Sequence, residues 1–428
     1  MKRRLIACIL CLAALFLSLP VCAADPPELS ATRYAYLYNP QFDTVLYEQN
    51  ADKVIYPAST VKIMTAILAI EYYRDRTDAK ITFTQDMLDL SGGTLISYKL
   101  GEVLTVDQLL YGLIVGGGND AAYALALSIS DSVEDFVALM NQKAAALGAT
   151  NTRFTNPTGV DDNLAYTTVR DLAAIASYAM GMREFLTYSS CERYFMEPTN
   201  MVGERIIANR NYLVSRSYIS TYYLSYATGL NAGSTVKGGD CCITSATKDG
   251  ITLVAIVMNA SRKEGALVNA AFADVKRMLE WAYANYGYEK VLRRADIVCE
   301  IPVDLSATVD YVSLLPKEEV SVYLPSDADP ETEIRREYRL YTERLRAPVE
   351  EGQEAGEMVL YYKDREVGRV ALITKNALAR STRLALLAAV RSTLISVGGL
   401  IAGVAILFFL LMLVLANAYL RGRTRRKR

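Results

Sequence analysis

The spacing of apolar residues changes twice between residues 30 and 286. Strand-like segments come first, at 34–38 and 44–47, with Asn39-Pro40 as the turn between them. Helical spacing then predicts helices from Ser59 to about residue 70 and over 106–115, 121–129, 133–147 and 168–180. Strands return at 241–246 and 251–258, and a helix over 270–286 ends the segment before Gly287, which we expect to cap it. This order predicts an α+β domain whose sheet joins both ends of the segment.

The pattern changes in residues 288–375, where short runs alternate between apolar and polar residues. The clearest runs are at 320–324, 358–362 and 367–373, and the last two flank a polar turn at 363–366. Residues 288–375 are therefore expected to form a small all-β domain.

The first residues have the features of a secretory signal peptide. Residues 2–4 are basic, residues 5–19 are apolar, and residues 21–23 form a small-residue cleavage signal. We therefore expect residues 1–23 to be a signal peptide. An N-terminal membrane anchor is the alternative, which the short apolar run disfavours.

The last residues have the features of a membrane anchor. Residues 392–420 carry no charge and are numerous enough to cross a bilayer, while the tail at 421–428 is almost wholly basic. Basic flanks stay on the cytoplasmic side, so the body is expected outside the cell membrane and the tail in the cytoplasm. Residues 376–391 mix arginines with leucines, which predicts an amphipathic juxtamembrane segment or a helical extension of the span.

Composition removes several classes of function. A net charge of −1 gives no general attraction to nucleic acid, so no nucleic-acid partner is expected. The sequence has no histidine, which excludes a Ser-His-Asp triad, Cys-His catalysis and zinc held by histidine. A nucleophilic serine would then need another base, for which lysine is the obvious substitute.

Four cysteines lie beyond the predicted signal peptide, and their spacing is not that of a zinc site. They are Cys191, Cys241, Cys242 and Cys299. Adjacent cysteines in a strand point to opposite faces, so we expect buried thiols, and the pattern assigns no disulfide.

Ser59 and Lys62 stand three positions apart at a predicted helix start, which puts both side chains on one face. The positive end of the helix dipole favours a developing alkoxide on Ser59, and a desolvated, neutral Lys62 can accept the hydroxyl proton. The same Ser-x-x-Lys pattern recurs at 234–237 and 245–248, but there in strand and turn surroundings. An ordinary helix-capping serine is the alternative for Ser59.

The stretch Tyr56–Ala66 resembles the nucleophile motif of the low-molecular-weight penicillin-binding proteins, the serine-type D-alanyl-D-alanine carboxypeptidases (peptidase S11-like). Further stretches resemble sequence motifs of the same family and follow in the same order, at 93–102, 113–122, 136–159, 226–235 and 347–353. The likeness covers roughly residues 28–375. It implies a D,D-peptidase-like catalytic domain over 28–286, with an antiparallel sheet and a helical subdomain as in serine β-lactamases. A β domain over 288–375 and a C-terminal transmembrane helix complete the fold.

The resemblance also implies a mechanism and partners. Ser59 would attack the carbonyl between the terminal D-alanines of a peptidoglycan stem peptide, with Lys62 as base and Asn119 in the catalytic set. Backbone N–H groups of Ser59 and Ser234 would form the oxyanion hole. β-Lactams would acylate the same serine, and neither a metal nor a cofactor is implied. The positions matching the family's substrate-binding residues are Gly117, Asn231, Ala232, Gly233, Ser234 and Thr235.

Two of the three motifs depart from the family pattern. The second motif, Ser-x-Asn in the family, has Gly117 in place of the serine, and the third, Lys-Thr-Gly, has Asn231 and Ala232 in place of lysine and threonine. Without that lysine we expect weaker binding of the substrate's terminal carboxylate and a Lys62 that is harder to deprotonate. Asn231 and Lys237 are the candidates to bind the carboxylate instead.

These departures leave two hypotheses of different classes. Intact Ser59, Lys62 and Asn119 favour a working D,D-carboxypeptidase of impaired activity. The changes at 117, 231 and 232 favour a catalytically inactive relative that binds peptidoglycan or penicillin.

Overall fold

The computed structural model describes residues 25–217, 219–262, 265 and 269–425. The predicted signal peptide at 1–23 and the end of the basic tail lie outside these residues. The described chain separates into two compact units, one reaching to Gly287 and including Tyr323–Asp327, the other made of Tyr288–Val322 and the chain from Ala328 on.

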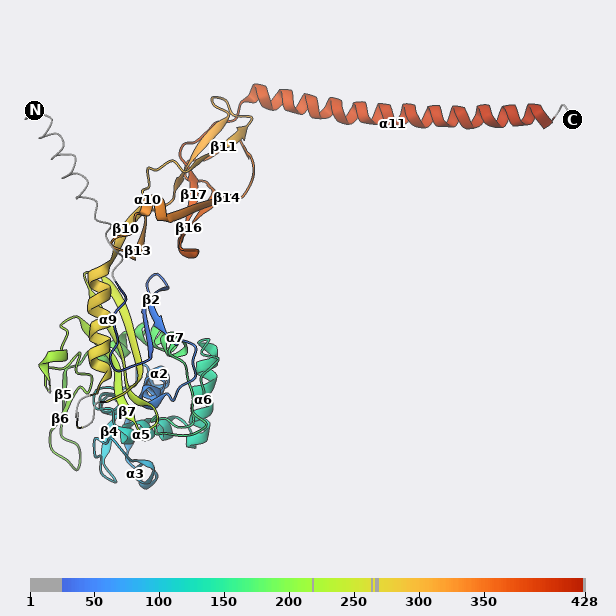
Figure 1. Ribbon diagram of the computed structural model, residues 1–428. Coiled ribbons are helices and arrows are strands. Elements are labelled where there is room, and N and C mark those ends of the chain that lie inside the picture. Colours follow the sequence, from blue (N-terminus) through green and yellow to red (C-terminus); the bar gives the residue numbers. More distant parts are fainter. Residues whose placement is uncertain (1–24, 218, 263–264, 266–268, 426–428) are drawn as a thin grey trace, which may run out of the picture. The chain divides into compact units, whose positions relative to one another are not determined.

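The first unit is built on a five-stranded antiparallel sheet (Figure 1). The strand order is β2-β1-β9-β8-β7, so the first hairpin joins the last strands through the pairing of β1 with β9, which confirms that one sheet unites both ends of the segment. The strands are β1 (Tyr34–Asn39), β2 (Thr44–Gln49), β7 (Ala227–Thr235), β8 (Gly239–Lys248) and β9 (Ile251–Ala260). β7 forms one edge of the sheet.

Helices cover both faces of this sheet. One face packs in a core with residues of α2, α4, α5, α6 and α7, and the other packs against α9. Their bounds are α2 (Val61–Tyr73), α4 (Val106–Ile114), α5 (Asn119–Ile129), α6 (Val133–Ala146), α7 (Val169–Met180) and α9 (Ala271–Asn285). In α2 all but three of 13 residues are buried, so any charged group on it is also withdrawn from water.

Local sequence explains where several of these helices begin. Thr105, Ser132 and Thr168 precede α4, α6 and α7, and each side chain accepts a hydrogen bond from a backbone N–H in the first turn. Such caps satisfy donors that have no partner inside the helix. The prediction for Gly287 was wrong, because α9 ends at Asn285 and extended Tyr286 starts β10 (Tyr286–Leu292), which contains Gly287.

Shorter elements surround the helices in the first unit. They include two two-stranded sheets, β3 with β4 and β5 with β6. Their bounds are η1 (Ala58–Thr60), β3 (Lys80–Thr82), α3 (Gln85–Leu90), β4 (Val103–Thr105), α8 (Arg183–Ser189), β5 (Arg193–Met196), β6 (Arg205–Ala208) and η2 (Ser220–Tyr222).

The second unit contains a six-stranded sheet, ordered β14-β16-β17-β12-β11-β15, while β10 pairs separately with β13. The bounds are β11 (Cys299–Asp304), β12 (Tyr311–Pro316), β13 (Val320–Pro325), α10 (Pro330–Glu333), β14 (Ile334–Leu340), β15 (Leu345–Arg346), β16 (Glu354–Tyr362) and β17 (Arg365–Thr374). β16 and β17 form a hairpin around the expected polar turn, which confirms the all-β character of this region.

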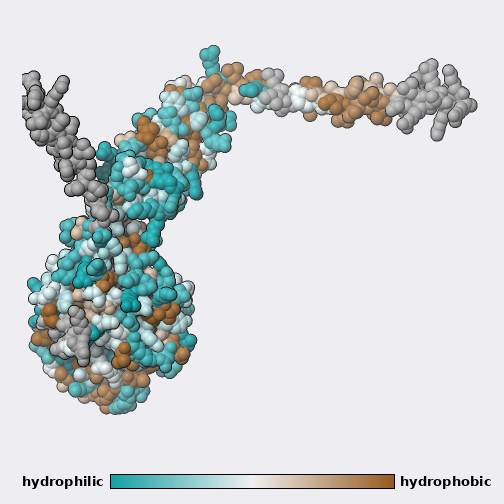
Figure 2. All heavy atoms as spheres, viewed as in Figure 1, coloured by the Kyte–Doolittle hydropathy of each residue, from teal (hydrophilic) through white to brown (hydrophobic). Residues whose placement is uncertain are grey.

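A single helix, α11 (Thr382–Arg425), follows the β strands. Hydrophobic residues cover much of its surface (Figure 2), and Thr382–Ala416 is long and apolar enough to cross a membrane. The helix runs without a break through the boundary expected at residue 392. An apolar surface of this length, which none of the described residues covers, suggests a membrane anchor.

Candidate active site

Ser59 lies in η1, the single 3-10 turn that leads into α2. The residue before it, Ala58, has a φ of 49°, a backbone conformation that costs a non-glycine residue ~1–3 kcal/mol. Gly159 holds this strained turn closely, because a Cβ built on it would lie 1.8 Å from the Ala58 carbonyl oxygen. The nucleophile candidate therefore sits on a turn whose shape is fixed by backbone packing.

Gly159→Ala should lower the free energy of unfolding by about 2–4 kcal/mol, because it adds a backbone clash to the cost of a positive φ. Gly148→Ala is the matched control, since Gly148 has a φ of 80°, close to the 79° of Gly159, but nothing lies within 4 Å of its added Cβ. Denaturant unfolding of both variants measures the difference. Equal losses would show that the contact with Ala58 is not a constraint.

Lys62 lies one turn into α2 and is only 4% exposed. Its ammonium group donates a hydrogen bond to the Thr158 carbonyl oxygen at 2.6 Å. Burial lowers the pKa of Lys62 to about 8, and the nearby Arg210 guanidinium also lowers it, against opposing effects of Cys241 and Asp120. Burial and a second cation therefore lower the pKa of Lys62 although the third-motif lysine is missing, as expected for a desolvated lysine. Whether Lys62 is harder to deprotonate than it would be beside that lysine stays a prediction.

Arg210→Gln should move the pKa of Lys62 upward, because one of the groups that disfavour its charged form is removed. At a fixed pH near 8 a smaller fraction of Lys62 would then be neutral, and the rising limb of any rate that needs neutral Lys62 would shift to higher pH. The measurement is the pH profile of acylation by a penicillin. An unmoved limb would contradict the role of Arg210.

Strand β7 lies directly against the nucleophile candidate. A Cβ built on Gly233 would approach both Cβ and Oγ of Ser59 to 2.4 Å, so only glycine fits at this point of the third motif. Ala232, Gly233 and Ser234 line the same cavity as Ser59 and Lys62. The structure therefore brings the first and third motifs together although they are far apart in the sequence.

Three of the predicted site residues do not line this cavity. Asn119 is buried at the start of α5, donates to the Gly92 carbonyl oxygen at 2.5 Å, and its Oδ1 has no partner among the described residues. Asn231 is also buried, with an Oδ1 that likewise lacks a described partner. Thr235 accepts a hydrogen bond from the Gly238 backbone N–H at 2.9 Å. Their roles in catalysis or binding remain predictions.

Gly117 does line the cavity, at the position of the missing serine. Its φ is 66°, and a Cβ there would lie 3.3 Å from Cδ of Arg210. The second motif therefore contributes only backbone to the cavity where the family pattern has a hydroxyl, and an added side chain would press on Arg210.

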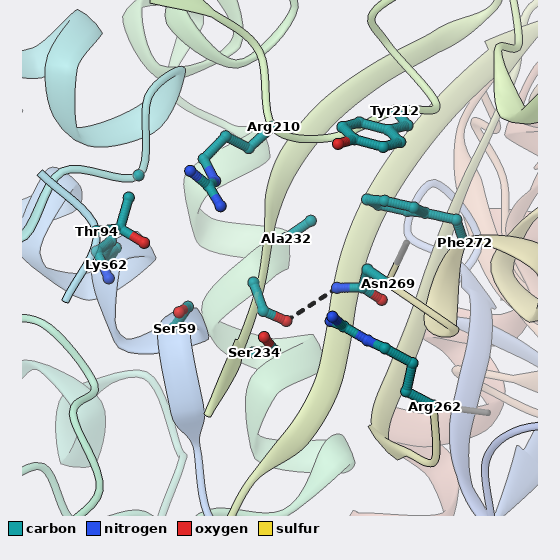
Figure 3. Close-up of a pocket in the computed structure, with 12 residues that line it drawn as sticks. Ser59, Lys62, Thr94, Arg210, Tyr212, Ala232, Ser234, Arg262, Asn269 and Phe272 are labelled. Carbon is teal, nitrogen blue, oxygen red and sulfur yellow. Dashed lines mark hydrogen bonds between the residues drawn. The ribbon is translucent and has the colours of Figure 1, made fainter. Parts of the chain in front are cut away.

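The cavity has a volume of about 240 Å³ and contains residues that the sequence did not single out (Figure 3). Two arginines, Arg210 and Arg262, extend into it from opposite sides, and Tyr212 stacks on Phe272 at its far end, with ring centroids 5.0 Å apart. The remaining new lining residues are Thr94 and Asn269. Cavity-lining residues include Lys62 and both arginines but no acidic side chain, so the cavity favours an anionic ligand.

Neither arginine is marked by a local pattern. Arg210 follows β6 and lies between Asn209 and Asn211, which are buried and hydrogen-bonded, so this Asn-Arg-Asn stretch was the only available signal. Lys237, proposed as a substitute cation, instead contacts the side chain of Asn163 and lines a different cavity. The part of the chain that the structure describes contains no group of acidic or cysteine side chains able to hold a metal, and its four cysteines are free.

The site combines a serine at a helix start, a buried lysine one turn later and an edge strand packed against the serine. In an α+β fold without histidine, these features define a serine acyl-transfer site. Comparison with known proteins agrees with this class. The family model described as D-alanyl-D-alanine carboxypeptidase matches residues 21–262, and the model of the penicillin-binding protein 5 C-terminal domain matches residues 286–380. The chain belongs to the peptidase S11 family of D-alanyl-D-alanine carboxypeptidases.

Individual relatives cover most of the chain. The D-alanyl-D-alanine carboxypeptidase DacF of Bacillus subtilis is 30% identical over 326 residues, covering 76% of this chain and 79% of its own length. The DacA enzyme of Haemophilus influenzae is 28% identical over 368 residues, covering 82% and 86%. Among solved structures, penicillin-binding protein 5 from Haemophilus influenzae matches with a TM-score of 0.64 and 25% identity, covering 83% of this chain and 100% of its own. These matches confirm the fold class that the motifs implied.

Proposed function

We propose that this protein removes the terminal D-alanine from peptidoglycan stem peptides through an acyl-enzyme on Ser59. The observation that carries the proposal is the buried Lys62, whose pKa of about 8 leaves a useful fraction of neutral amine near neutral pH, in the cavity that Ser59 lines. The family's activity and the positions of the first and third motifs support the same assignment.

The proposed reaction has two steps. Ser59 Oγ attacks the carbonyl between the two D-alanines while Lys62 accepts the hydroxyl proton, and the C–N bond then breaks as the leaving amine gains a proton. Backbone N–H groups of Ser59 and Ser234 bind the oxyanion. Water then attacks the acyl-enzyme ester, releasing the shortened peptide and restoring the Ser59 hydroxyl. β-Lactams acylate Ser59 by the same first step.

The proposed setting is the outer side of the cell membrane. In this arrangement α11 is the anchor, residues 421–428 lie in the cytoplasm and the catalytic unit faces the peptidoglycan. The apolar surface of Thr382–Ala416 supports an anchor, and the basic end of the chain supports its direction.

The experiment incubates the full chain in detergent with an N-acylated tripeptide ending in D-Ala-D-Ala and measures released D-alanine, with intact mass after penicillin treatment in parallel. We expect release of D-alanine and a covalent penicillin adduct. A folded sample that gives neither result would favour the catalytically inactive relative. An adduct without release would indicate a penicillin-binding protein impaired at its altered motifs.

A further inference from the structure

The proposed acylation step needs a proton donor for the leaving amine. A peptide nitrogen departs as an amine only when it gains a proton as the C–N bond breaks. Gly117 brings no hydroxyl to this part of the site. Lys62 takes the proton of Ser59, but it is only 4% exposed. A more exposed neighbour that bears a hydroxyl would carry the proton from the buried lysine to the substrate.

Among the described residues, four side chains with a hydroxyl group line the cavity: Ser59, Thr94, Tyr212 and Ser234. Ser59 is the proposed nucleophile, and Tyr212 lies at the far end of the cavity (Figure 3). Figure 3 also shows Thr94 on the side of Ser59 where Lys62 lies, whereas Ser234 lies on the side of β7. Thr94 is therefore the candidate hydroxyl on the side of the base.

The first two residues of α5 hold Thr94 in this place. The backbone N–H of Asn119 donates to the Thr94 carbonyl oxygen at 2.8 Å, and the Asn119 side chain donates to the Gly92 carbonyl oxygen at 2.5 Å. The buried carboxylate of Asp120 accepts a hydrogen bond from the Ser97 backbone N–H at 2.8 Å. The loop is thus fastened to the second motif before and after Thr94, so its side chain is preorganised at the cavity wall.

The Thr94 hydroxyl is free to take part in the reaction. The residue is half-buried, and none of the described residues forms a hydrogen bond with its hydroxyl. A hydroxyl group both donates and accepts, so it can take a proton from one partner while it gives its own to another. The Lys62 ammonium has three N–H donors, and the Thr158 carbonyl oxygen occupies one of them. The others remain for Thr94 and the reacting atoms.

We propose that the Thr94 hydroxyl donates the proton to the leaving D-alanine nitrogen, at a site where the second motif has no hydroxyl. The inference rests on the proposed function for the reaction. As Ser59 Oγ bonds to the carbonyl carbon, its proton passes to neutral Lys62. As the C–N bond breaks, the Lys62 ammonium gives that proton to Thr94 Oγ1 while Thr94 gives its own to the nitrogen. Thr94 and Lys62 end the step as they began it, and Thr94 is a catalytic residue.

Two substrates with the same acyl group test this role in the full chain in detergent. One is the N-acylated tripeptide ending in D-Ala-D-Ala, and the other is a thioester, whose thiolate departs without needing a proton. Thr94→Val keeps the branched shape but lacks the hydroxyl. We expect it to lower kcat/KM for the peptide by ~10²-fold or more, as loss of an acid catalyst does, and for the thioester by less than ~10-fold. Thr94→Ser keeps the hydroxyl and should retain most of kcat/KM for both substrates.

Ser97→Ala is the matched control, because Ser97 belongs to the same loop but lines a neighbouring cavity. It should leave kcat/KM for both substrates unchanged. The proposal is overturned if Thr94→Val leaves cleavage of the peptide intact, or if it slows both substrates equally, as a displaced loop would. Failure of the proposed function appears separately, in the unmodified chain. If that chain does not release D-alanine from the peptide, no group donates the proton and both proposals fall.

Discussion

Ser59→Ala should abolish the covalent penicillin adduct and lower D-alanine release by more than ~10³-fold, because it removes the hydroxyl that we propose as the nucleophile. The hydroxyl lies against Gly233, in a position that the strained turn at Ala58 and the packing of Gly159 impose. Removing one oxygen leaves these contacts in place, so the variant should fold. The measurements are intact mass after penicillin treatment and timed release of D-alanine.

The chain provides its own control for this substitution. Ser245 belongs to another Ser-x-x-Lys tetrapeptide, but it lies in β8 and donates a hydrogen bond to the Gly229 carbonyl oxygen at 3.1 Å. Ser245→Ala should therefore keep the adduct. An adduct that persists in Ser59→Ala but disappears in Ser245→Ala would place the nucleophile elsewhere and refute the assignment.

Lys62→Met should slow acylation by ~10²–10⁴-fold, the range expected when a general base is lost. In the unmodified chain the base must be neutral, so with a pKa of about 8 the rate should rise as the pH approaches 8 and level off above it. The Lys62→Met variant should lose this increase of the acylation rate with pH, as well as most of the rate itself. Methionine keeps the unbranched stem, which suits the packed interior of α2.

Lys237→Met is the matched control for the lysine, because it alters the repeated tetrapeptide outside the cavity. We expect its acylation rate and pH profile to match those of the unmodified chain. A Lys62→Met protein that retains both the rate and the limb near pH 8 would show that another group accepts the proton.

Much of the first unit was predictable because its segments have strong periodicity. The hairpin of β1 and β2, the helices from α4 to α7 and the pair β8 and β9 appear within a few residues of their expected bounds. Ser59 and Lys62 were found for a related reason, since their chemistry depends on two residues one helical turn apart. Patterns within a short stretch of chain can be recognised without knowing the fold.

The two arginines of the cavity show what local sequence patterns miss. Arg210 and Arg262 enter the cavity from segments that follow different strands, and only the sheet register places Asp240 next to both Ser234 and Arg262. The size of the Lys62 pKa shift could not be read from local patterns for the same reason. It depends on the burial of α2 and on Arg210, neither of which the third motif alone can reveal.

The backbone angles at the altered motifs also determine how readily each change could be reversed. Positions 231 and 232 lie in regular pairs of β7 with β8, where the main chain accepts any L-residue. Gly117 has a φ of 66°, so a serine at this position would carry a backbone strain of roughly 1–2 kcal/mol. Single substitutions could thus return the lysine and threonine without backbone strain, whereas the serine returns only with a loss of stability. Reversion by mutation is therefore harder at the second motif than at the third.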